Sequence, residues 1–117
     1  MYINKIPCIM FIIYRILNKL NGKKYVGMTS RPVITRFKEH CRNTHRRISN
    51  AIQAYGTNNF ICSEIAHADT LSLALFLEKE NIIKENALQP YGYNRMCCGR
   101  DAQFLFLKNS GRQYDLF

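Results

Sequence analysis

The hydrophobic pattern in the first third of the chain predicts a β-hairpin. Residues Ile9–Leu17 form an apolar, β-branched run with the length of a buried strand. The polar segment after it contains Asn21-Gly22, a common turn pair, and Lys24–Thr29 returns as a second strand. We therefore expect two antiparallel strands that open the domain.

The length of the turn decides which residues face each other across this hairpin. A two-residue turn at Asn21-Gly22 would pair Tyr14 with Thr29, whereas a longer loop would pair Tyr14 with Tyr25. Side chains alternate between the two faces of a strand, so both registers place Tyr14, Tyr25 and Gly27 on the same face. The missing side chain of Gly27 would leave room there for a close approach to the backbone.

The pattern changes from strand to helix after the hairpin. Ser30-Arg31-Pro32 is typical of a helix start, and apolar residues then recur at helical spacing, at Ile34, Phe37 and Cys41. Arg36 and His40 are four residues apart, so they share one flank of this helix.

Three further elements follow in the middle of the chain. A short helix is predicted over Ile48–Tyr55, ending at Gly56, and a strand over Phe60–Ala66. Asp69 or Thr70 can cap a long helix that continues to about residue 86. Together with the hairpin, these elements predict an α/β fold in which helices flank a small central sheet.

The long helix carries a carboxylate at an unusual place. Glu80 falls within an apolar stripe formed by Leu73, Phe76, Leu77 and Ile83, whereas Glu78 points elsewhere. A carboxylate that faces the core costs several kcal/mol unless it is paired or binds a cation. A second apolar stripe of Leu71, Leu75 and Ile82 runs along the other side, and periodicity alone does not decide which stripe meets the sheet.

Length and composition place these elements in one domain. With 117 residues, of which 47% are hydrophobic, we expect a single domain spanning 1–117. No apolar run reaches the ~18 residues of a membrane span, so we expect no membrane partner. The five cysteines are odd in number and include no Cys-x-x-Cys pair, which favours reduced thiols and a cytoplasmic protein, in the host cell if the protein is viral.

The net charge narrows the class of partner. Seventeen Lys and Arg residues against eight Asp and Glu give +9, and the surplus is concentrated between residues 31 and 47. Clustered cations are typical of binding to a phosphate backbone, although a solvated basic face would have the same composition. The candidate nucleic-acid-binding residues are Arg31, Lys38, Arg42, Arg46 and Arg47.

Several other residues have the chemistry that phosphodiester hydrolysis needs. A cation held by a carboxylate offsets phosphate charge, and a guanidinium stabilises the developing anion. A tyrosine can deprotonate water if its pKa is lowered by a metal, by Arg36 or by a hydrogen bond to His40. Taken alone, each tyrosine, Arg36 and His40 is more often a structural residue than a catalyst.

The order of these residues resembles the GIY-YIG nuclease family. Ile13-Tyr14 is followed after ten residues by Tyr25-Val26-Gly27, which is similar to the two family motifs. The resemblance continues through 28–30, 36–40, 51–60, 78–81 and 92–94 and covers about residues 10–96. One departure is Ile12, which stands where the first motif has glycine and bears on the backbone geometry around Tyr14.

The resemblance implies a role for each matching residue. Tyr14 would be the general base that activates water, and Tyr25 would position the water and the phosphate. Arg36 would contact the scissile phosphate, and His40 would form a hydrogen bond within the site. Asn94 would brace the site.

The resemblance also implies a cofactor and a reaction. Glu80 would hold a single divalent ion, Mg²⁺ or Mn²⁺, and the domain would be a metal-dependent endonuclease that hydrolyses DNA. Such members occur in mobile introns, phages and other viruses, in restriction and in repair. Two alternatives on the same fold are a nucleic-acid-binding module without catalysis, which would not need a buried glutamate, and a protein-interaction module, which would show no salt-sensitive affinity for DNA.

Overall fold

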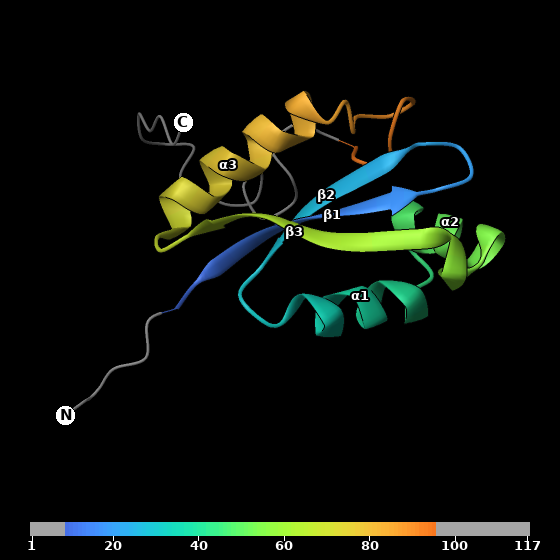
Figure 1. Ribbon diagram of the computed structural model, residues 1–117, viewed down its shortest axis with the longest axis horizontal. Helices are drawn as coiled ribbons and strands as arrows, with labels where there is room; N and C mark the ends of the chain where they lie inside the picture. The colour runs from blue at the N-terminus through green and yellow to red at the C-terminus, as the bar shows by residue number, and fades with distance from the viewer. Residues whose placement is uncertain (1–8, 96–117) are drawn as a thin grey trace.

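The computed structural model describes residues 9–95 (Figure 1). Within this range one antiparallel sheet contains the strands β1 (Phe11–Asn18), β2 (Lys24–Thr29) and β3 (Phe60–Ala68), in the order β2-β1-β3. The helices are α1 (Val33–Arg42), α2 (Arg47–Tyr55) and α3 (Leu71–Lys84), with a short 3₁₀ turn at Thr57–Asn59. The predicted α/β fold is therefore confirmed; the ends of the predicted 1–117 domain lie outside the described residues.

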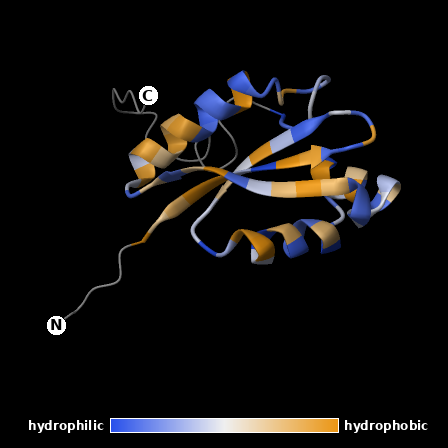
Figure 2. Ribbon diagram, viewed as in Figure 1, coloured by the Kyte–Doolittle hydropathy of each residue, from blue (hydrophilic) through white to orange (hydrophobic). Residues whose placement is uncertain are grey.

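Helices cover both faces of the sheet. Figure 1 shows α3 on one side of the strands and α1 on the other. On the α1 and α2 side, Tyr14 and Ile16 pack with Ile48 and Ile52 of α2. On the opposite side, Ile13 packs against α3 within a cluster that also contains Val26, Ala68, Ala74 and Ile82. Because β1 is central and covered on both faces, its sequence is mostly apolar, with Arg15 and Asn18 as the hydrophilic exceptions (Figure 2).

The register of the hairpin differs from both predicted registers. Tyr14 pairs with Gly27, and Ile16 pairs with Tyr25. Residues 19–23 connect the two strands, and Asn18 closes this loop by donating its backbone N–H to the carbonyl of Lys23 at 2.9 Å. The predicted common face is confirmed, since Tyr14, Tyr25 and Gly27 still point to the same side of the sheet.

The strand around Tyr14 is irregular on its other edge. The β1–β3 register shifts between Ile13 and Tyr14, so that Ile65 is an extra residue on β3. Such a bulge increases the local twist and re-aims the neighbouring side chains. Ile12, at the position of the motif glycine, pairs regularly with both neighbouring strands and packs against the Tyr14 side of the core.

The other predicted elements agree closely with the structure. The short second helix ends at Gly56, whose φ of 94° favours glycine. Thr70 caps α3, because its side chain accepts a hydrogen bond from the backbone N–H of Leu73 at 3.2 Å. Between residues 9 and 95, no helix is long and apolar enough to cross a membrane.

Candidate active site

Two tyrosines and a histidine form a compact aromatic cluster between the sheet and α1. Tyr14 and His40 are each only 1% exposed, and the Tyr14 hydroxyl lies 2.8 Å from His40 Nε2 in a hydrogen bond. The ring centroids of Tyr25 and His40 are 5.2 Å apart in an edge-on arrangement, and those of Tyr14 and Tyr25 are 6.2 Å apart. The pairing of β1 with β2 and the position of His40 on α1 thus bring together three of the predicted site residues, Tyr14, Tyr25 and His40.

Gly27 makes this cluster possible. It lies directly across from Tyr14 on β2, and the Tyr14 phenol passes over its Cα. A Cβ atom at residue 27 would come within 2.5 Å of the Tyr14 Cζ and hydroxyl oxygen. The glycine of Tyr25-Val26-Gly27 is therefore explained by the close approach of the first tyrosine, and its φ is not positive.

Burial dominates the electrostatics of Tyr14 and His40. Burial raises the pKa of Tyr14 well above 10.0, the nearby Tyr25 adds to this rise, and the Arg36 cation opposes it. Burial also lowers the pKa of His40 from 6.5 to about 3, assisted by the charges of Arg36 and Arg46. In the protein alone, both groups are therefore neutral at ordinary pH, and the lowered tyrosine pKa that a base requires is absent.

His40 should make folding sensitive to acid. Between pH 6.5 and about 3, an unfolded chain binds a proton that the folded chain does not. The free energy of unfolding should be level above pH 6.5 and fall as the pH is lowered below it, by a few kcal/mol, on the order expected for such a shift. Chemical denaturation of the wild type and His40→Gln across pH 4.5–7.5 measures this effect.

The variant should have the flatter curve of the two. Glu39 does not interfere above pH 4.5, because its pKa is lowered from 4.5 to about 2 by hydrogen bonds from Arg31 and Arg36, so its contribution is lost only at more acidic pH. The remaining histidines are common to both proteins and cancel in the comparison. Equal slopes for the two proteins would contradict the neutral, buried state of His40.

Arg36 is held next to the aromatic cluster by a network of ion pairs. Its Nη1 donates to Glu39 Oε1 at 2.9 Å, and Arg31 donates two hydrogen bonds of 2.6 and 2.8 Å to the same carboxylate. Burial lowers the pKa of Arg36, but Tyr14 and Glu39 outweigh that effect, and the net pKa is raised. Arg36 thus remains charged beside Tyr14, and the predicted DNA-binding residue Arg31 is engaged with Glu39.

The buried glutamate of α3 is Glu78, and the prediction that Glu80 is buried is wrong. Glu78 is 6% exposed and lies on the side of α3 that carries Ala74, Leu75 and Ile82. Glu80 is exposed. The helix meets the sheet with the second of its two apolar stripes, and Leu73, Phe76 and Ile83 of the first stripe are exposed with Glu80.

Glu78 belongs to the surroundings of Tyr25. Burial raises the pKa of Tyr25, the Arg46 cation opposes this rise, and the Glu78 carboxylate adds to it. Arg46 Nη1 also donates to the Tyr25 hydroxyl at 3.4 Å. The Tyr25 hydroxyl therefore has a guanidinium at the start of α2 as its hydrogen-bond donor and is affected by the charge of a carboxylate on α3. Arg46 belongs to the basic cluster predicted from the sequence, and nothing in the sequence indicates its contact with a tyrosine.

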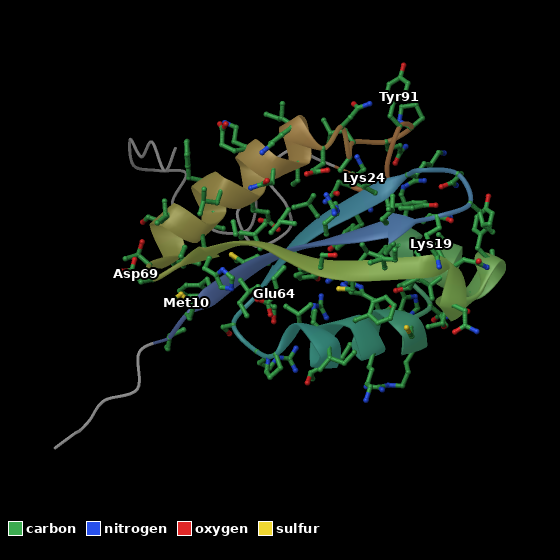
Figure 3. All side chains as sticks on the ribbon, viewed as in Figure 1. Met10, Lys19, Lys24, Glu64, Asp69 and Tyr91 are labelled. Carbon is green, nitrogen blue, oxygen red and sulfur yellow. The ribbon has the colours of Figure 1, made fainter. Side chains whose placement is uncertain are left out.

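Asn94 braces the outer edge of β2. Its amide makes two hydrogen bonds of 2.9 Å, accepting from the backbone N–H of Val26 and donating to the carbonyl of the same residue. Tyr93 extends this pairing by donating its backbone N–H to the carbonyl of Lys24, the residue of β2 that is labelled in Figure 3. Asn94 thereby holds the strand segment between Tyr25 and Gly27. Both hydrogen bonds of its side chain go to the Val26 backbone and not to the Tyr14 hydroxyl.

Removing the Asn94 amide should loosen β2. Asn94→Ala leaves two backbone groups of Val26 without their partner, so we expect a loss of about 2 kcal/mol in the free energy of unfolding. The Val26 amide should also exchange its hydrogen faster than in the wild type. Denaturant titration and hydrogen exchange measure the two effects. The exposed Asn50→Ala is the control, expected within about 0.5 kcal/mol of the wild type; equal stability of both variants would contradict the bracing role.

The predicted basic residues do not form one surface. Lys38 and Arg42 are both exposed, and each is two positions from His40, so they lie on the side of α1 away from the aromatic cluster. Arg46 and Arg47 instead line a groove beside Tyr25. The six predicted catalytic residues therefore separate into a cluster of Tyr14, Tyr25, Arg36 and His40, a bracing residue, Asn94, and the exposed Glu80.

Comparison with known proteins identifies the family and the fold. The GIY-YIG catalytic domain family matches residues 10–94, and the chain belongs to this family. The catalytic domain of the intron endonuclease I-TevI, in a variant with one glutamate replaced by alanine, is 25% identical, with a TM-score of 0.66 over 77% of this chain and 97% of that chain. A second structure, of the catalytic domain of the homing endonuclease I-TevI, is 26% identical, with a TM-score of 0.62 over 72% and 96%. No curated protein matches the sequence.

Proposed function

We propose that the domain is a divalent-metal-dependent DNA endonuclease that hydrolyses phosphodiester bonds. The observation that carries this proposal is the buried cluster of Tyr14, Tyr25 and His40 beside the Arg36 cation, together with the nearly buried Glu78 carboxylate, whose charge raises the pKa of Tyr25. Burial of a carboxylate costs free energy, so its retention on α3 favours a role beyond packing. The kinship to an intron endonuclease supports the same activity.

Tyr14 is the candidate general base for the attacking water. His40 fixes the direction of the Tyr14 hydroxyl through the 2.8 Å hydrogen bond, and it does so as a neutral ring. Because burial raises the pKa of Tyr14, loss of its proton needs positive charge nearby, and Arg36 supplies part of that charge. Arg36 also has the geometry and charge to pair with the scissile phosphate.

Glu78, rather than Glu80, would hold the metal ion. Within residues 9–95 no three His, Cys, Asp or Glu side chains gather in one place. Mg²⁺ nevertheless fits the single carboxylate, since it keeps several waters and binds one or two carboxylates plus substrate phosphate oxygens. Bound there, Mg²⁺ or Mn²⁺ would neutralise phosphate charge and lower the pKa of nearby oxygen acids. The free thiols of Cys41 and Cys62 fit the cytoplasmic location that we expect.

Incubation of the wild-type protein with supercoiled plasmid tests the proposal. We expect relaxed or linear DNA with Mg²⁺ or Mn²⁺ and intact plasmid with EDTA. Intact plasmid under all conditions, with salt-sensitive DNA binding, would instead favour a binding module on the same fold. Absence of both cleavage and binding would favour an interaction module.

A further inference from the structure

A groove with a volume of about 780 Å³ opens beside the aromatic cluster. It is lined by Tyr25, by the segment before α2, by the first turn of α2 and by residues 93–95. The volume is within the range of cavities that enclose an organic ligand of moderate size. Because Tyr25 is one of the lining residues, the groove adjoins the aromatic cluster.

The lining of this groove is cationic. Arg46, Arg47 and Arg95 contribute three guanidinium groups, and none of the described residues in the lining is acidic. The first turn of α2 also has no acidic residue and no side-chain cap, so the partial positive charge of the helix N-terminus adds to these charges. A cavity of this composition favours a chain of phosphate groups.

Arg46 connects the groove to the reaction centre. Its guanidinium both lines the groove and donates to the Tyr25 hydroxyl at 3.4 Å. A phosphate bound in the groove would therefore lie next to Tyr25. Other cations are less suited to bind these neighbouring phosphates: Arg31 pairs with Glu39, Arg36 is assigned to the scissile phosphate itself, and Lys38 and Arg42 lie on the far side of α1.

We infer that this groove binds the backbone phosphates of the cleaved DNA strand that adjoin the scissile phosphate on the Tyr25 side. The inference rests on the proposed nuclease function. In this inference Arg47 and Arg95 contact phosphates of the DNA strand, and Arg46 contacts both a phosphate and the Tyr25 hydroxyl. Lys38 and Arg42 are not part of the surface that binds the cleaved DNA strand.

Equilibrium binding to a DNA duplex in EDTA tests the assignment without cleavage. Arg47→Gln/Arg95→Gln removes two groove cations, and Lys38→Gln/Arg42→Gln removes the same charge from the far side of α1. Each lost phosphate contact reduces the slope of log affinity against log salt by about 0.9. We expect the groove variant to lose about two such contacts and roughly tenfold or more in affinity at moderate salt. The control variant should keep the wild-type slope.

Cleavage of modified strands tests the position. Neutral methylphosphonates placed singly along the cleaved strand should slow the wild type at the positions next to the cut on one side only, and this sensitivity should disappear in the groove variant. Equal salt slopes for the groove and control variants, or equal methylphosphonate patterns for wild type and groove variant, would overturn the inference. A wild type that binds through the groove but never cleaves would refute the nuclease function alone.

Discussion

Tyr14→Phe is expected to slow single-turnover DNA cleavage by about 10²–10⁴-fold, the usual contribution of a general base. The substitution removes only the hydroxyl and keeps the ring that fills the space above Gly27, so the fold should be retained. Because burial raises the pKa of Tyr14, the wild-type rate should rise with pH over a broad range as the phenol ionises. This rising limb should be absent from the pH–rate profile of Tyr14→Phe.

Tyr25→Phe provides the matched comparison. It removes the same atom from a neighbouring ring that shares the cluster and contacts Arg46, but a positioning hydrogen bond is only part of a base's contribution. We therefore expect a smaller loss than for Tyr14→Phe and a pH profile that keeps its rising limb. Thermal melting of both variants controls for folding. If Tyr14→Phe cleaved as fast as the wild type, the role of base would pass to another group.

Glu78→Gln is expected to abolish metal-dependent cleavage and to leave DNA binding intact. The amide keeps the shape of the side chain but loses the negative charge that would hold a divalent ion. Because the amide occupies nearly the same volume as the carboxylate, we expect the variant to keep the native fold. DNA affinity measured in EDTA, together with a melting curve, separates loss of the ion from loss of the fold. A variant that failed to bind DNA would contradict the assignment of Glu78 to the metal alone.

The part of the site that local sequence determines was predictable. Strand alternation places Tyr14, Tyr25 and Gly27 on one face whichever turn joins the strands, and helical spacing puts Arg36 beside His40. The pairing register of the hairpin was not predictable from the Asn21-Gly22 pair. The loop is closed instead by Asn18, through hydrogen bonds of both its backbone and its side chain. Pairing of Tyr14 with Gly27, rather than with Thr29 or Tyr25, is what explains the glycine.

The part of the site that depends on packing was not predictable from periodicity. Leu73, Phe76 and Ile83 make a stripe as apolar as that of Leu75 and Ile82, so the sequence cannot tell which side of α3 meets the sheet. The signal that was available is the position of Glu78, three residues after Leu75 and four before Ile82. Once that second stripe is taken as the buried one, Glu78 replaces Glu80.

Contacts between distant segments were also beyond the sequence. Asn94 pairs with the backbone of Val26, 68 residues away, and Arg46 reaches the hydroxyl of Tyr25. Nothing in the local pattern of either residue specifies these partners. The basic cluster was visible as composition, but only the helix geometry separates Arg46 and Arg47 at the groove from Lys38 and Arg42 on the far side of α1.

The assignment of the metal ion to Glu78 is tested most directly by comparing Glu78→Gln with Glu80→Gln in one cleavage assay. Both variants make the same change on the same helix, one at a nearly buried position and one at an exposed position. The measurement is the initial rate of plasmid cleavage as a function of Mg²⁺ concentration. If Glu78 holds the ion, Glu78→Gln should show no detectable cleavage at any Mg²⁺ concentration, and Glu80→Gln should cleave at the wild-type rate. Wild-type cleavage by Glu78→Gln, or loss of cleavage in Glu80→Gln, would contradict this assignment.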